Sequence, residues 1–203
     1  KTEVMVEHFQ QHTRHKIGGQ AKAMVVTGSR LEAVRYKLEF DRYIHAKGYP
    51  IKSLVAFSGT VADDKMPDKN YTEVEMNNGL KEKDLPETFA KSDYRVLLVA
   101  EKYQTGFDQP LLHTMYVDKR LAGIQAVQTL SRLNRTHPLK DDTFVLDFVN
   151  DPDEIQEAFR QYYDGSIMGE EVDPDRLYEV KAELDGAGIY QQDEVDAFAH
   201  IFF

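Results

Sequence analysis

Three polar side chains near the middle of the chain have types and a spacing that suit binding of a polyanion. Gln128, Arg132 and Arg135 belong to the string Q-T-L-S-R-L-N-R, which lies in a run of good helix formers from Leu121 to Asn134. At about 100° per residue they share one narrow face of the predicted helix. Two guanidinium groups and an amide on one face suit a triphosphate. The alternative is an amphipathic surface helix whose arginines are merely solvated.

The elements that must position these side chains strengthen the first interpretation. An apolar strand from Arg95 to Ala100 precedes the turn T-G-F-D (105–108), and a second strand from Leu112 to Val117 precedes the arginine string. This order resembles the second motor domain of superfamily 2 helicases and translocases. Their motif V is similar to the T-G-F-D turn. Their motif VI, Q-x-x-G-R-x-x-R, is similar to the arginine string, with Ser131 in place of the usual glycine.

A longer stretch narrows the resemblance. The run A-E-K-Y-Q-T-G-F-D-Q-P-L-L-H-T-M-Y-V-D-K and the later Q-T-L-S-R-L-N-R-T-H resemble the motor (R) subunit of type I restriction-modification enzymes. The similarity begins near Ala21 and runs to about Asp151, roughly two thirds of the chain. It implies a RecA-like fold and membership of an ATP-hydrolysing, site-specific deoxyribonuclease.

The resemblance implies a role for each residue of a nucleotide site. Arg135, the last arginine of motif VI, would be the finger that stabilises charge on the γ-phosphate, with Arg132 as the second catalytic candidate. Asp108 would accept a ribose hydroxyl, Gly106 would allow close backbone approach, and Gln128 would complete the nucleotide-binding set. An ordinary turn is the alternative for the Asp108 segment.

Four further residues are candidates for contacts with DNA. Ser29 and Arg30 lie in a segment that resembles motif IV, which is near the nucleic-acid path in this superfamily. A helix cap is the alternative for this pair. Lys102 and Thr105 are candidates for further phosphate contacts.

Two motifs of complete motors are missing from the sequence. It contains no G-x-x-x-x-G-K-[ST] loop to cradle phosphates and no strand that ends in an Asp-Glu pair for magnesium. We therefore expect ATP and Mg²⁺ to act in the full-length enzyme, with neither bound tightly by this fragment, which would be inactive alone. His8 and His12 have the i, i+4 spacing of a metal pair, but a polar helix face explains them, and we predict no metal site.

The charge distribution and the amino-acid composition indicate the cell compartment and the kind of partner to expect. The net charge is −10, but residues 138–203 hold 18 acidic and 4 basic residues, whereas residues 1–137 hold 17 acidic and 21 basic ones. A mildly basic segment can track a phosphate backbone with a few contacts. No run approaches 18 apolar residues and cysteine is absent, so we expect a cytoplasmic protein without a membrane span or disulfide frame. The absence of an initiator methionine before Lys1 suggests a piece of a longer chain.

The fold class follows from strands that alternate with helices. Five strands are predicted, at 23–27, 52–57, 95–100, 112–117 and 143–149. This pattern predicts an open, doubly wound α/β sheet with parallel strands, flanked by helices and followed by a C-terminal helical extension. Residues 58–78 are predicted to form a long surface loop and residues 80–91 a helix. The predicted domains are an N-terminal helix or linker (1–20), the second motor domain (21–151) and an acidic helical extension cut in mid-element (152–203).

The resemblance also implies partners. These are double-stranded DNA, the first motor domain and nuclease domain of the same chain, and separate methyltransferase and specificity subunits, with no membrane. Two alternatives stay open. One is a translocase with another task, such as repair or remodelling, and the other is a non-catalytic interaction domain that keeps this fold.

Overall fold

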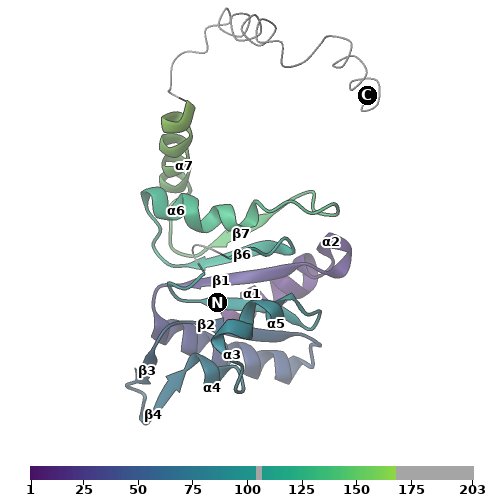
Figure 1. The fold of residues 1–203 in the computed structure, drawn as a ribbon, viewed down its shortest axis with the longest axis vertical. Coiled ribbons are helices and arrows are strands. Elements are labelled where there is room, and N and C mark those ends of the chain that lie inside the picture. The colour runs from purple at the N-terminus through teal and green to yellow at the C-terminus, as the bar shows by residue number, and fades with distance from the viewer. Residues whose placement is uncertain (104–106, 168–203) are drawn as a thin grey trace, which may run out of the picture. The chain divides into compact units, whose positions relative to one another are not determined.

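Five parallel strands form the central sheet (Figure 1), in the order β2-β5-β1-β6-β7. The computed structural model describes residues 1–103 and 107–167. The strands of the sheet are β1 (Lys22–Thr27), β2 (Lys52–Ala56), β5 (Tyr94–Val99), β6 (Leu112–Asp118) and β7 (Phe144–Asp147). The predicted parallel α/β sheet flanked by helices is confirmed.

Helices cover both faces of the sheet. The α-helices are α1 (Thr2–His8), α2 (Lys16–Gly19), α3 (Arg30–Lys47), α4 (Glu73–Met76), α5 (Leu85–Ala90), α6 (Gly123–Leu130) and α7 (Pro152–Ile167). Successive side chains of a strand point to opposite faces. In β1, Ala23 and Val25 therefore join the core layer formed with α1 and α3, whereas Met24 and Val26 join the layer formed with α5, α6 and α7. Every residue of β1 is buried, as expected for a strand covered on both faces.

The N-terminal helix belongs to this core. Met5, Val6 and Phe9 are fully buried in the same layer as α3, and a π-helical turn (Phe9–Thr13) continues α1. The first compact unit of the chain runs from Lys1 to Tyr162. The second unit is Tyr163–Phe203, of which the structure describes residues 163–167, the end of α7. The domain boundaries after residues 20 and 151 stay predictions. Among the described residues, no helix combines the length and apolar character needed to cross a bilayer.

The prediction of a long loop at residues 58–78 is wrong. This segment forms an antiparallel hairpin of β3 (Thr60–Asp63) and β4 (Met66–Thr72), followed directly by α4. The cross-strand partners Val61 and Tyr71 are buried in the core layer of α3. Thr72 starts α4 with a reciprocal capping box to Glu75, a signal that the string T-E-V-E already carried. The helix predicted at 80–91 is shorter, a 3₁₀ turn (Glu82–Asp84) followed by α5.

Helix α4 protects the outer edge of β2. The Asn77 side chain accepts a hydrogen bond from the Val55 amide at 3.0 Å and donates one to the Val55 carbonyl at 2.7 Å. Glu73 accepts a hydrogen bond from the Phe57 amide at 2.8 Å. Side chains thus satisfy backbone groups that a further strand would otherwise pair.

Lys22, the first residue of β1, is enclosed by the protein. The residue is 1% exposed, and its ammonium donates to the carbonyls of Lys91 at 2.8 Å and Tyr94 at 2.7 Å. The ammonium also lies 5.0 Å from the centre of the Phe89 ring. Burial, helped by the charge of Arg95, lowers the pKa of Lys22 to about 8. The folded protein therefore releases this proton at a lower pH than the unfolded chain does.

This difference predicts a pH-dependent stability. Between pH 8 and 10 the unfolded chain keeps the Lys22 proton while the folded chain loses it, so the free energy of unfolding rises with pH. Relative to Lys22→Met, the wild type should gain on the order of 1 kcal/mol over this range, a figure discounted for solvent screening. Urea unfolding at several pH values measures it, with the exposed Lys83→Met as a control. A stability difference that stays constant with pH would contradict the prediction.

Candidate functional site

The two arginines do not share a helix face with Gln128. Helix α6 ends at Leu130, and a single 3₁₀ turn (Ser131–Leu133) follows it. Asn134 leaves the helical region, with ψ at 38°. The prediction of one helix through residue 134 is therefore wrong, since serine and asparagine favour caps and turns over helix interiors. Gln128 lies exposed on α6, and Arg135 lies beyond the helix.

The structure nevertheless brings both arginines to the T-G-F-D turn. Arg135 Nε donates to Asp108 Oδ1 at 2.9 Å, and Arg132 Nη1 donates to the Phe107 carbonyl at 3.4 Å. The Arg135 and Asp108 side chains are 40% and 73% exposed. An ion pair this exposed contributes about 0–1 kcal/mol, so a phosphate group can compete for the guanidinium. Gly106 and Thr105 lie outside the described residues.

This meeting point lies at the amino-terminal end of β6. Ligands of open α/β sheets usually bind outside the carboxyl ends of the strands, so this meeting point lies at the other end. Because β5 and β6 are parallel, their connection must return to the amino end of the sheet before β6 begins, and Asp108 lies at the end of that return. The Leu112 amide that opens β6 donates to the Gln109 carbonyl at 3.0 Å. Helix α6 likewise returns the chain to this end, where Arg135 follows it.

Ser29 and Arg30 lie at the opposite end of the sheet, after the carboxyl end of β1. Ser29 is the N-cap of α3 and accepts a hydrogen bond from the Glu32 amide at 3.2 Å. Exposed Arg30 donates to the Ser58 carbonyl at 2.9 Å. At roughly 3.3 Å per residue, a strand of this length puts about 20 Å between the two ends. The candidate site residues thus form two groups rather than one.

Lys102, a predicted phosphate contact, has carboxylate partners inside the domain. Its side chain is 13% exposed and pairs with Glu73 at 2.9 Å and with Glu82. Burial opposes the charge, but the hydrogen bonds to Glu82 and Glu73 outweigh burial and raise the pKa of Lys102. The ammonium neutralises the buried Glu73 carboxylate, which itself holds the end of β2.

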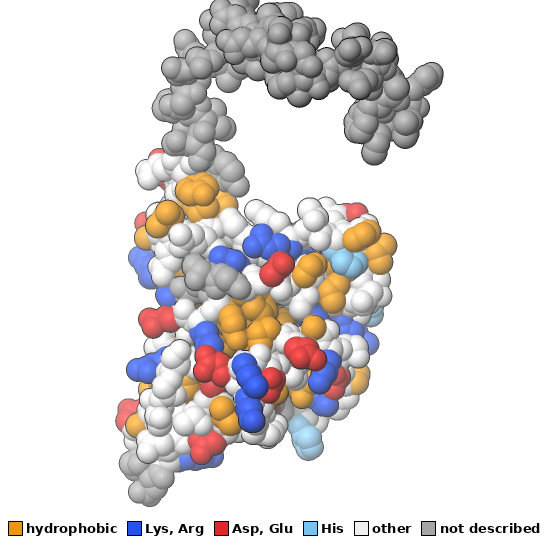
Figure 2. All heavy atoms as spheres, in the orientation of Figure 1, with side chains coloured by type: hydrophobic (Ala, Val, Ile, Leu, Met, Phe, Trp, Pro, Cys, Tyr) orange, Lys and Arg blue, Asp and Glu red, His pale blue; other side chains and the backbone are white. Residues whose placement is uncertain are grey.

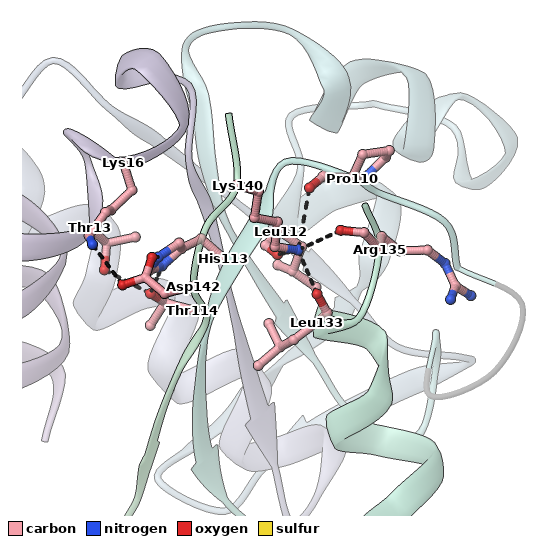
Figure 3. Close-up of polar contacts among 10 residues, drawn as sticks. All are labelled: Thr13, Lys16, Pro110, Leu112, His113, Thr114, Leu133, Arg135, Lys140 and Asp142. Atoms are coloured by element: carbon pink, nitrogen blue, oxygen red, sulfur yellow. Dashed lines mark hydrogen bonds and ion pairs between the residues drawn. The ribbon is translucent and has the colours of Figure 1, made fainter. Parts of the chain in front are cut away.

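Lys140 was not identified from the sequence, yet it contacts the backbone on both sides of Asn134, in the segment that carries the two arginines (Figure 3). Its ammonium donates to the carbonyls of Leu112 at 2.7 Å, Leu133 at 2.5 Å and Arg135 at 3.0 Å. Burial lowers the pKa of Lys140, and the charge of Arg135 adds to this effect. In the string P-L-K-D-D this lysine looks like any solvated charge, and no local signal distinguishes it.

Two residues further along, Asp142 fixes the same segment to another part of the domain (Figure 3). The Asp142 carboxylate forms hydrogen bonds with His113 Nε2 at 2.9 Å and with Lys16 Nζ at 2.7 Å. The hydrogen bonds from Lys16 and His113 lower the pKa of Asp142. The other ring nitrogen of His113 contacts the Thr114 hydroxyl, which in turn contacts Thr13. The segment that follows Arg135 is therefore held at two points, Lys140 and Asp142.

His8 and His12 line a pocket of about 380 Å³ near the start of β7. Their ring centres are 5.1 Å apart. His8 contacts the Tyr116 hydroxyl at 2.9 Å and stacks on Phe144 at 4.6 Å. Within residues 1–103 and 107–167, no group of three His, Cys, Asp or Glu side chains is arranged to hold a metal ion.

The surface drawn in Figure 2 has mixed charge. Lys and Arg side chains alternate with Asp and Glu around a central hydrophobic patch. On this face, any phosphate group is therefore bound by individual contacts rather than by a broad positive field.

The fold and site define an open α/β domain with helices on both faces and two arginines placed against a turn that contains an aspartate. Residues 69–150 match the family described as Type I restriction enzyme subunit R domain 3. This match and the relatives described next confirm the resemblance to the R subunits of type I restriction enzymes seen in the sequence.

Relatives with this description cover much of the chain. The MjaIXP type I restriction enzyme endonuclease subunit of Methanocaldococcus jannaschii is 31% identical over 160 residues, which cover 78% of this chain and 14% of that protein. The MjaVIIP subunit of the same organism is 32% identical over 139 residues, 63% of this chain and 13% of that protein. The HindI endonuclease subunit of Haemophilus influenzae is 32% identical over 79 residues, 37% of this chain and 8% of that protein. The chain thus spans a small part of each relative.

Among solved structures, the C-terminal part of the Fun30 ATPase domain aligns with a TM-score of 0.47 and 10% identity, over 77% of this chain and 44% of that one. The helicase domain of Pyrococcus furiosus Hef aligns with a TM-score of 0.43 and 16% identity, over 79% of this chain and 27% of that one.

Proposed function

We propose that this chain is the second motor domain of an ATP-dependent double-stranded DNA translocase within a type I restriction endonuclease. The observation that carries the proposal is the contact between Arg135 and Asp108, with Arg132 beside it. Residues from two distant segments converge where a guanidinium is half exposed and only weakly held. That arrangement suits an arginine that changes partner when a phosphate arrives.

The chemistry proposed for this chain is electrostatic. In phosphoryl transfer, charge develops on the γ-phosphate oxygens, and an arginine supplied from outside the phosphate-binding loop stabilises it. Arg135 would leave Asp108 to make that contact with ATP held by the first motor domain, and Arg132 would support it. Asp108 would then be available for a ribose hydroxyl. Closure and opening of the two motor domains would step along DNA, with Ser29 and Arg30 among its contacts.

The described residues do not fit a magnesium site, because no group of three suitable side chains is arranged for one. Mg²⁺ would therefore act at the nucleotide site of the full-length enzyme, outside the residues that the structure describes. The fragment alone would be inactive. The parent would act in the cytoplasm with methyltransferase and specificity subunits, and its nuclease domain would cut DNA after translocation.

Displacement of a triplex-forming strand from duplex DNA tests the function. The full-length protein, assembled with its partner subunits, should displace the strand with ATP and not with a non-hydrolysable analogue. The double variant Arg132→Ala/Arg135→Ala should lose displacement while it still binds DNA. Displacement that survives in this variant would argue against a motor role for the site and favour a non-catalytic domain. A parent without nuclease activity would favour another class of translocase.

A further inference from the structure

The ammonium of Lys140 lies among backbone carbonyls. It donates to Leu112, Leu133 and Arg135 at 2.5–3.0 Å, and the Pro110 carbonyl lies at 3.5 Å. Three ammonium protons match the three short contacts. Among the described residues no carboxylate pairs with Lys140, so this charge is balanced by peptide dipoles. Hydrogen bonds from a charged donor are roughly twice as strong as those between neutral groups.

These contacts join strand β6 to the turn that follows α6, two segments that belong to no common helix or pair of strands. Leu112 is the first residue of β6, in the interior of the sheet. Leu133 is the last residue of the 3₁₀ turn and Arg135 lies beyond it, and the last backbone hydrogen bond of that turn runs from the Asn134 amide to the Ser131 carbonyl at 3.1 Å. Lys140 therefore fixes the backbone on both sides of Asn134 to a rigid strand, while the Arg135 guanidinium points away from it (Figure 3).

We propose that Lys140 is a positioning residue for the arginine finger. It holds the peptide of Arg135 against β6 so that the guanidinium is presented from a fixed backbone. This inference rests on the proposed function, because it concerns the catalytic contribution of Arg135. A misplacement of about 1 Å at a catalytic group can cost roughly 10²-fold in rate, and a lysine that touches only backbone can have that effect.

DNA-stimulated ATP hydrolysis by the full-length protein with its partner subunits tests the proposal. Lys140→Met keeps the length of the side chain and removes its donors. We expect kcat to fall about 10²-fold with KM for ATP nearly unchanged, because a contact made in the transition state is lost. Lys83→Met, a change of the same kind at an exposed lysine, should leave kcat unchanged.

A double-mutant cycle separates positioning from general stabilisation. With Arg135 already replaced by alanine, Lys140→Met should cause little further loss of kcat, because both changes remove one contribution. Single-turnover measurements with excess enzyme keep the slow double variant measurable. Lys140→Gln, which retains an amide donor, serves the same cycle if Lys140→Met fails to fold.

The outcomes distinguish this inference from the proposed function. An unchanged kcat in Lys140→Met, or a full additional loss on top of Arg135→Ala, would overturn the positioning role while Arg135→Ala remained inactive. If Arg135→Ala itself kept normal turnover, the finger assignment and the positioning role would both fail.

Discussion

Arg135→Ala should lower DNA-stimulated ATP turnover by about a thousandfold or more in the full-length protein assembled with its partner subunits. The expected loss is this large because a finger acts on charge that exists mainly in the transition state. The Arg135 side chain is 40% exposed and held by Asp108 at 2.9 Å, so the folded domain does not depend on it. DNA binding should persist, since the DNA candidates Ser29 and Arg30 lie at the other end of the sheet.

Two further variants sharpen this experiment. Arg135→Lys keeps the charge and loses the planar fork, so it should recover only part of the turnover. Arg160→Ala removes an arginine that is 59% exposed and paired with Glu157 on α7, and it should behave as wild type. Normal turnover in Arg135→Ala would end the assignment of Arg135 and leave Arg132 as the remaining finger candidate among the described residues.

Phe40→Ala should lower the free energy of unfolding by about 3–5 kcal/mol, the usual cost of emptying an aromatic site in a core. Phe40 is fully buried on α3, in the layer that joins α1, α3 and the sheet. Its ring meets that of Tyr36 edge-on, with the ring centres 6.4 Å apart. Because the cavity would lie between helix and sheet, neighbouring side chains can fill it only in part.

Leu38→Ala is the matched control for this prediction. Leu38 lies on the same helix and is 37% exposed, so its replacement should change stability much less than Phe40→Ala does. Denaturant unfolding of both variants measures the difference in the free energy of unfolding between a buried and an exposed position of the same helix. Equal losses would contradict the packed layer between α3 and the sheet.

The sequence by itself determined the sheet. Each of its five strands was predicted within about two residues, because short runs rich in branched apolar residues, bounded by turn residues, favour strands. The cap at Ser29 was one of the two interpretations that the local sequence allowed. The two motif strings identified the family, since their residue types and spacing are a property of the chain alone.

Tertiary structure decided what these parts do together. Residues 60–76 form a hairpin and helix whose burial depends on α3. Lys102 is held by Glu73 and Glu82, while Arg135 meets Asp108 at the amino end of β6. Lys140 is held by carbonyls from two separate segments. Each outcome depends on contacts between residues distant in the sequence. Such contacts compete with local preference through burial and charge, and only the folded chain brings them within reach.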